Sequence, residues 1–150
     1  MTKLRVAIVG ASGYSGEELI RLLIRHPEVE ITCITSRQEA GKTAGAVFPR
    51  YRECELLFSK PDINEISEKA DVAFLALPHG LAKDYAVPLL ENNIKVIDIS
   101  ADFRLHDEAI YEKYYKTVHP APELLKKSVY GLPEIYREEI KNGSLIACPG

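Results

Sequence analysis

The chain of 150 residues fits one globular domain, and its content of 46% hydrophobic and 27% charged residues excludes a disordered protein. With 19 Lys and Arg against 22 Asp and Glu, the net charge is −3 and no basic block occurs, which argues against nucleic acid or a membrane surface as a partner. No run approaches the roughly 18 apolar residues of a membrane span, and the first apolar run is too short for a signal-peptide core, so we expect a cytoplasmic protein.

Short β-like runs alternate with helix-like runs along the chain. In chain order, the sequence predicts a strand at 4–9, a helix at 14–25, a strand at 30–35, a loop at 38–52, a short edge strand at 55–58, a helix at 61–69, a strand at 71–77, a helix at 80–91 interrupted at Pro88, a strand at 95–99, helices at 107–115, 122–127 and 133–141, and a strand at 144–147. Strands separated by helices are typical of βαβ units and a parallel sheet. We therefore predict the α/β class with a doubly wound parallel sheet of the Rossmann type.

Two helix ends carry recognisable local signals. Asp62 stands where an N-cap belongs, and Glu65 follows three residues later, which is the spacing of a capping box. Asn142 and Gly143 follow the helix at 133–141, and this pair predicts a left-handed C-cap.

The first strand-to-helix junction reads GASGYSG. Gly10 allows the tight turn off the strand, Gly13 lets the backbone approach a pyrophosphate, and Gly16 lets the helix pack closely against the strand. Free N–H groups at the helix N-terminus then face the anion. The context predicts a dinucleotide-binding loop rather than a turn needed only for packing. Its cofactor-binding residues are Gly10, Ser12, Gly13, Tyr14, Ser15 and Gly16.

The end of the second strand indicates which dinucleotide is preferred. NAD-specific domains place an acid about 20 residues beyond the glycine loop, on the ribose 2′-hydroxyl. Here the chain reads Ser36-Arg37, with no carboxylate before Glu39. A guanidinium suits a 2′-phosphate, and Ser36 offers a further hydrogen bond, so we expect NADP (NADPH) as the cofactor. Alternatively, Arg37 is a solvated surface charge, and Lys42 is a weaker candidate for a second cation.

Three more strand ends should face the same crevice, because ligands of such sheets bind beyond the carboxyl ends of the strands. Pro78 and His79 follow one strand and are expected to contact the cofactor, although His79 could also be a general acid or merely begin a helix. Ser100 could contact cofactor or substrate, or cap the turn. Asp102 and Arg104 could form a structural ion pair, or Arg104 could bind an anionic substrate.

The chain holds three cysteines, Cys33, Cys54 and Cys148. Their number is odd and no two have CxxC spacing, so neither a disulfide framework nor a metal site is expected. Each is interpreted as a small, reduced hydrophobic residue.

Five segments occur together in one order: residues 10–16, ALPHG at 76–80, DISADFRL at 98–105, YGLPE at 130–134 and the final Pro149-Gly150. In this combination the chain resembles the N-acetyl-γ-glutamyl-phosphate reductases, the NADPH-dependent acyl-phosphate reductases of arginine biosynthesis. It is also similar in plan to the aspartate-semialdehyde dehydrogenase superfamily. The glycine loop is generic, whereas SADFRL and YGLPE are specific, and the resemblance extends from Val6 to Gly150.

The resemblance implies that a cysteine thiolate attacks an acyl phosphate to give a thioester, which NADPH reduces to N-acetylglutamate 5-semialdehyde. The family's nucleophile directly follows the Pro-Gly that stands here at 149–150. Cys148 precedes that pair and is therefore not expected to be the nucleophile. Family members also carry a second α/β domain and subunit contacts. We accordingly expect residues 1–150 to be the NADP-binding part, truncated before the catalytic cysteine, inactive alone and homo-oligomeric when full length.

Two other functional classes share a glycine-rich first loop. Extended short-chain reductases and epimerases require a Tyr-xxx-Lys pair, and none of the tyrosines here has a lysine four residues later. The other alternative is a dinucleotide-binding module that senses redox state without catalysis.

Overall fold

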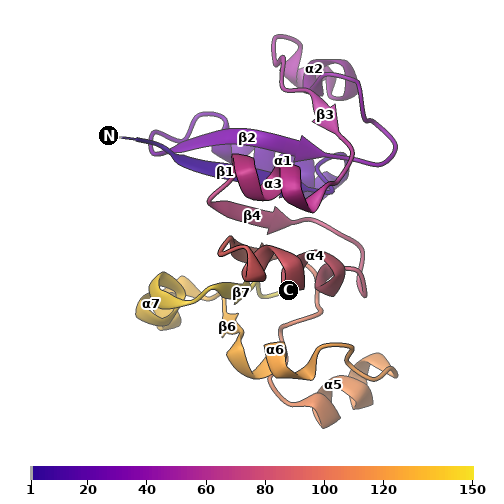
Figure 1. Ribbon diagram of the computed structural model, residues 1–150, viewed down its shortest axis with the longest axis vertical. Helices are drawn as coiled ribbons and strands as arrows, with labels where there is room; N and C mark the ends of the chain where they lie inside the picture. The colour runs from indigo at the N-terminus through magenta and orange to yellow at the C-terminus, as the bar shows by residue number, and fades with distance from the viewer. Residues whose placement is uncertain (1) are drawn as a thin grey trace.

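A computed structural model of the chain describes residues 2–150 and contains one sheet with helices on both faces (Figure 1). The strands are β1 Leu4–Val9, β2 Val29–Thr35, β3 Phe58–Ser59, β4 Val72–Leu75, β5 Lys95–Asp98, β6 Val129–Tyr130 and β7 Leu145–Ala147. The helices are α1 Tyr14–Leu23, α2 Ala44–Val47, the 3-10 helix η1 Pro49–Tyr51, α3 Ile63–Lys69, α4 Ala82–Glu91, α5 Glu108–Tyr115, α6 Pro122–Lys127 and α7 Pro133–Asn142.

The strands lie in the order β3-β2-β1-β4-β5-β7-β6, and every strand pair in this sheet is parallel. The chain first builds outward from β1 to β3 and then returns to place β4 on the other side of β1. This reversal creates the crevice in which doubly wound sheets bind their ligands. The predicted doubly wound α/β fold is confirmed.

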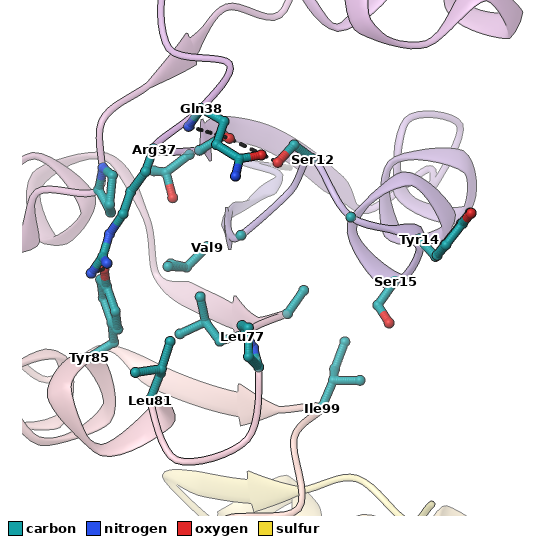
Figure 2. A pocket seen from close by; sticks show the side chains of 17 residues that line it. Val9, Ser12, Tyr14, Ser15, Arg37, Gln38, Leu77, Leu81, Tyr85 and Ile99 are labelled. Atoms are coloured by element: carbon teal, nitrogen blue, oxygen red, sulfur yellow. Dashed lines mark hydrogen bonds between the residues drawn. The ribbon is translucent and has the colours of Figure 1, made fainter.

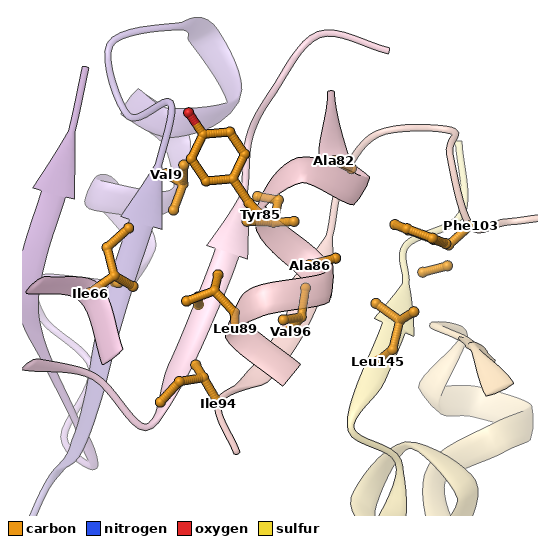
Figure 3. Packing of buried hydrophobic residues seen from close by; sticks show 14 of the residues in the cluster. Val9, Ile66, Ala82, Tyr85, Ala86, Leu89, Ile94, Val96, Phe103 and Leu145 are labelled. Carbon is orange, nitrogen blue, oxygen red and sulfur yellow. The ribbon is translucent and has the colours of Figure 1, made fainter. Parts of the chain in front are cut away.

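Alternation along β1 divides the hydrophobic core into two layers. Val6 and Ile8 face the layer that contains Ile20 of α1, whereas Ala7 and Val9 face the opposite layer. Figure 3 shows that second layer, where residues of α3 and α4 pack together over the sheet. Both faces of the central strands are therefore buried, which explains their nearly continuous apolar sequences.

The segment at 38–52 was predicted to be a loop, and this prediction was wrong in its second half. Thr43 caps α2 by accepting a hydrogen bond of 3.2 Å from the amide of Ala46, and η1 follows directly. Ala44 and Phe48 are buried in the core layer next to α1. These short helices are stabilised by burial against the rest of the fold, and they are too short to show a helical hydrophobic period in the sequence. The edge strand is also shorter than predicted and begins only at Phe58.

Three further expectations need correction. The two-residue strand β6 was not predicted, and α4 continues through Pro88 because its apolar side packs into the core. Gly143 ends α7 with an extended backbone at φ −72° instead of the predicted left-handed cap. A Cβ at Gly143 would lie 2.8 Å from Cγ2 of Val129 and 3.0 Å from Cδ1 of Ile146, so close packing disfavours a side chain here. The predicted N-cap Asp62 is confirmed, because its carboxylate accepts a 2.9 Å bond from the amide of Glu65.

Candidate functional site: a dinucleotide cleft

A cleft of about 540 Å³ opens where β1, β2 and β4 end (Figure 2). Its walls come from the loop between β1 and α1, the residues that follow β2, and the first turns that lead into α4. Several predicted cofactor-binding residues line it: Gly10, Ser12, Gly13, Tyr14, Ser15, Ser36, Arg37 and Pro78. The sequence motif at the first strand and the basic residue after the second strand thus meet in one concavity.

The three glycines of the loop differ in what a side chain at each position would contact. Gly10 has φ +80°, and a side chain there would overlap the carbonyl oxygen of Ala76. A Cβ at Gly16 would overlap the backbone of Ala11, so this glycine lets α1 approach the loop. A Cβ at Gly13 would meet no atom within 4 Å and would project into open space beside the cleft. The fold therefore requires Gly10 and Gly16, whereas Gly13 leaves room for a ligand.

The N-terminus of α1 faces the same space. Gly13 is the N-cap of α1, and no side chain within residues 2–150 caps this end. The first amides of a helix lack intrahelical acceptors, and the helix dipole adds partial positive charge there. Ser15 lines the cleft at this end, whereas the ring of Tyr14 is 95% exposed and contacts little of the protein. The arrangement suits a phosphate group.

A pair of serine hydroxyls lies at the other side of the loop. Ser12 Oγ and Ser36 Oγ are 2.8 Å apart, and Ser36 Oγ also accepts bonds from the amides of Gln38 at 3.2 Å and Glu39 at 3.1 Å. A hydroxyl has two acceptor lone pairs and one proton. Because both lone pairs of the Ser36 hydroxyl accept bonds from these amides, Ser36 acts as the donor in its bond to Ser12. The hydroxyl of Ser12 can then donate a hydrogen bond to a ligand.

Arg37 extends across the cleft from the end of β2 toward α4 (Figure 2). Its Nη2 donates to the hydroxyl of Tyr85 at 3.2 Å. Lys42, the weaker candidate cation, instead forms an ion pair with Glu39 at 2.7 Å. Thr35 also lines the cleft, and its buried hydroxyl has no hydrogen-bond partner in the described part of the chain. The cleft thus carries one guanidinium and an unsatisfied polar group beside its apolar walls.

His79 and Ser100, which were predicted to contact the cofactor, make hydrogen bonds to the protein instead of lining this cleft. Nδ1 of His79 lies 2.6 Å from Oδ1 of Asp102, and its Nε2 lies 3.5 Å from the hydroxyl of Tyr111. The imidazole packs against Tyr115 with ring centroids 4.8 Å apart. Ser100 Oγ donates to Asp98 at 2.8 Å and accepts from the amide of Asp102 at 3.1 Å. Gly16, which was also predicted to contact the cofactor, is buried and does not line the cleft.

Arg104 holds the segment after β7 in place. Its Nε donates to the carbonyl of Cys148 at 2.7 Å, and its Nη2 donates to the carbonyl of Ile99 at 2.9 Å. The suggested ion pair between Asp102 and Arg104 is not formed among residues 2–150, because Asp102 is paired with His79. Two backbone carbonyls therefore use two of the five N–H donors of the guanidinium that was considered for substrate binding.

Burial shifts the pKa of two groups near these strand ends. Desolvation raises the pKa of Asp98 to about 6, although bonds from Ser100 oppose the shift. Desolvation also raises the pKa of the Cys148 thiol, and the nearby Asp98 carboxylate adds to the effect. A thiol with a raised pKa is mostly protonated and a poor nucleophile near neutral pH. This environment agrees with the expectation that Cys148 is not the nucleophile.

The sequence interpretation missed part of the cleft wall, namely Val9, Thr35, Gln38, Pro61, Ala76, Leu77, Leu81, Tyr85 and Ile99. Several of these directly follow or end the predicted strands, and that position was the available signal. Leu81 and Tyr85 lie one helical turn apart, so their shared orientation could have been read from the predicted helix. Nothing in the sequence paired Tyr85 with Arg37.

Other kinds of site find less support. All three cysteines are free, and residues 2–150 contain no cluster of three or more His, Cys, Asp or Glu side chains suited to a metal ion. The helices of the described chain also lack the combined length and hydrophobicity that a membrane crossing requires.

Comparison with known proteins agrees with the fold. Residues 5–143 match the family described as semialdehyde dehydrogenase, NAD binding domain. The structure is similar to aspartate semialdehyde dehydrogenase with NADP from Candida albicans, with a TM-score of 0.71 and 20% identity over 98% of this chain and 42% of the other.

Curated relatives bear two kinds of name. The [LysW]-L-2-aminoadipate/[LysW]-L-glutamate phosphate reductase of Saccharolobus solfataricus is 52% identical over 99% of this chain and 42% of its own length. The N-acetyl-gamma-glutamyl-phosphate reductase of Nitrosococcus oceani is 51% identical over 98% of this chain and 43% of its own length. The chain thus spans about two fifths of the length of these relatives. Because the matched family is a different one, the short-chain reductase alternative is set aside. The chain belongs to the semialdehyde dehydrogenase family and corresponds to its NAD-binding domain.

Proposed function

We propose that the chain is the NADPH-binding domain of an acyl-phosphate reductase. The full-length protein would convert N-acetyl-γ-glutamyl phosphate to N-acetylglutamate 5-semialdehyde and phosphate, in arginine biosynthesis. The observation that carries the cofactor assignment is the meeting of the glycine loop and Arg37 in one cleft. NADPH supplies the hydride in this chemistry, and the chain's own residues bind and orient it.

The described residues fit a dinucleotide. The first amides of α1 and the open space at Gly13 suit the pyrophosphate. The free proton of Ser12 and the guanidinium of Arg37 suit a 2′-phosphate, because both are donors and Arg37 is permanently charged. The apolar side chains of Leu77 and Leu81 offer surface to the rest of the cofactor. No carboxylate follows β2 directly to repel a 2′-phosphate, and this favours NADPH over NADH.

We further propose that the nucleophile is the cysteine that family resemblance places directly after Gly150, and that it reacts through a thioester. The 150-residue chain would then bind NADPH without turning over substrate. Mixing the chain with N-acetyl-γ-glutamyl phosphate and NADPH should leave the absorbance at 340 nm unchanged. Steady oxidation of NADPH would contradict this part of the proposal and would assign the chemistry to residues within the chain.

The acyl group is the least constrained part of the proposal. A relative named for LysW-linked substrates is 52% identical, and one named for N-acetyl-gamma-glutamyl phosphate is 51% identical. A second candidate substrate is therefore a LysW-linked acyl phosphate of aminoadipate or glutamate. Comparing kcat/KM of the full-length protein for the two substrate types distinguishes them. A clear preference for the LysW-linked substrate would overturn the N-acetyl assignment and leave the cofactor assignment intact.

The cofactor proposal is tested by titrating NADPH and NADH into the wild type and Arg37→Ala. We expect Arg37→Ala to weaken NADPH binding by about 10-fold or more and to change NADH binding little, because charge-assisted bonds are strong. Lys42→Ala is the matched control. Because Lys42 is paired with Glu39, this variant should leave the ratio of NADPH to NADH affinity unchanged. An unchanged NADPH to NADH ratio in Arg37→Ala would remove the 2′-phosphate assignment.

A further inference from the structure

Arg37 and Tyr85 form the one direct side-chain hydrogen bond that spans the cleft from the end of β2 to α4, among the contacts of residues 2–150. The bond runs from Arg37 Nη2 to the Tyr85 hydroxyl at 3.2 Å. Figure 2 shows the guanidinium beside this hydroxyl, at the side of the cleft that lies away from Ser15. The contact therefore determines where the positive charge is held.

The two partners differ in burial. Tyr85 is 8% exposed, and its ring packs in the core near Val9, Ile66 and Leu89 (Figure 3). A tyrosine packed in this way has a fixed ring and a polar tip, so its hydroxyl is a fixed point. Arg37 is exposed and would otherwise sample many rotamers, which costs entropy when a ligand orders the side chain.

The chemistry of the partner also matters. No carboxylate within residues 2–150 lies within 4 Å of the Arg37 guanidinium, and its side-chain hydrogen-bond partner is a hydroxyl group. A hydroxyl orients the guanidinium without neutralising its charge, whereas a carboxylate would compete with an incoming phosphate. The other nitrogens of the fork stay available for a bidentate contact with phosphate oxygens.

We infer that Tyr85 is a positioning residue that orients Arg37 toward the 2′-phosphate and so sets the preference for NADPH over NADH. This inference rests on the proposed function, because it assumes that Arg37 receives the 2′-phosphate. Tyr85 acts through Arg37 and not through the reacting atoms.

The test compares Tyr85→Phe, Arg37→Ala and the double variant by titration with NADPH and NADH. Tyr85→Phe keeps the buried ring and removes only the hydroxyl. We expect it to weaken NADPH binding about five-fold, the value of one hydrogen bond, and to leave NADH binding unchanged. In the Arg37→Ala background, Tyr85→Phe should have no further effect on NADPH. Tyr130→Phe, outside the cleft, is the matched control.

Different failures point to different errors. If Tyr85→Phe weakens NADPH and NADH equally, or still weakens NADPH when Arg37 is alanine, the tyrosine supports the cleft in general and the inference is overturned. If Arg37→Ala loses the NADPH preference while Tyr85→Phe keeps it, only the inference fails. If Arg37→Ala retains the preference, the proposed cofactor assignment fails together with the inference.

Discussion

The buried carboxylate of Asp102 lies 2.6 Å from Nδ1 of His79, within ion-pair distance. It also accepts bonds from the amides of Gly80 at 2.8 Å and Ala82 at 3.0 Å. The residue before α4, Leu81, provides no side-chain cap, so Asp102 performs that task from the loop after β5. The loop that walls the cofactor cleft is thereby attached to the neighbouring strand end.

Asp102→Ala should lower the free energy of unfolding by about 3 kcal/mol, because it leaves the amides of Gly80 and Ala82 without their acceptor, and the bond to Ala82 is buried. Urea denaturation followed by circular dichroism measures the loss. Asp107→Ala is the control, since it removes an exposed N-cap bond of 3.0 Å to Ile110 and should cost about 1 kcal/mol. Equal losses in the two variants would show that Asp102 is an ordinary cap.

The glycine loop allows stability and binding to be separated. Gly16→Ala should destabilise the chain by about 2 kcal/mol or more, because its Cβ overlaps the backbone of Ala11. Gly13→Ala should leave the thermal midpoint nearly unchanged, because the added methyl group meets no atom within 4 Å. It should weaken NADPH binding about 10-fold, because the methyl group would occupy the space proposed for the pyrophosphate. Parallel thermal melts and NADPH titrations test both. Full NADPH affinity in Gly13→Ala would place the pyrophosphate elsewhere.

Asp98 should make the stability depend on pH. Its pKa is raised to about 6 in the folded chain, compared with about 3.9 when unfolded. Between these values the folded state binds more protons, so stability falls as the pH rises from about 4 to 6 and stays reduced above. At neutral pH, the raised pKa of Asp98 lowers the free energy of unfolding by about 3 kcal/mol relative to low pH.

Asp98→Asn should remove this part of the pH dependence, because the amide is neutral throughout. Urea denaturation of both proteins between pH 4 and 8 gives the difference, which should grow in favour of the variant up to about pH 6. Asp107→Asn controls for the change in net charge at an exposed site. Parallel pH curves for the wild type and Asp98→Asn would contradict the raised pKa.

Arg104→Ala should loosen the segment after β7. The variant loses the bonds to Cys148 and Ile99, both charge-assisted, and should be less stable by about 2 kcal/mol. Hydrogen exchange measured by mass spectrometry should increase for the peptide that contains Cys148, which donates its amide to the carbonyl of Asp98. Lys127→Ala, which removes an exposed cation, is the control. Unchanged exchange would show that the strand pairing alone holds this segment.

The sequence predicted the sheet well because its central strands are buried on both faces. The apolar runs of β1 and β4 and the N-cap Asp62 carry their structure in local pattern. The helix α2 and the strand β6 do not. They are a few residues long, and they form because distant residues bury Phe48 or pair with β7.

The candidate site shows the same division. The glycine loop, Ser36 and Arg37 were identified because each follows a strand that the sequence marks clearly. His79 and Ser100 occupy equivalent positions, yet His79 pairs with Asp102 and Ser100 donates to Asp98, and neither side chain lines the cleft. Position at a strand end therefore predicted which polar residues gather at this edge, but not which of them line the cleft.

The place of β7 in the sheet has a consequence for synthesis on the ribosome. This strand pairs with β5 on one side and β6 on the other, so the last of the seven described strands to be translated is an interior one. Until residues 145–147 emerge, β5 presents an open hydrogen-bonding edge in the nascent chain. Such an edge is a template for association with other chains, so a pause in translation before β7 would expose the protein to aggregation.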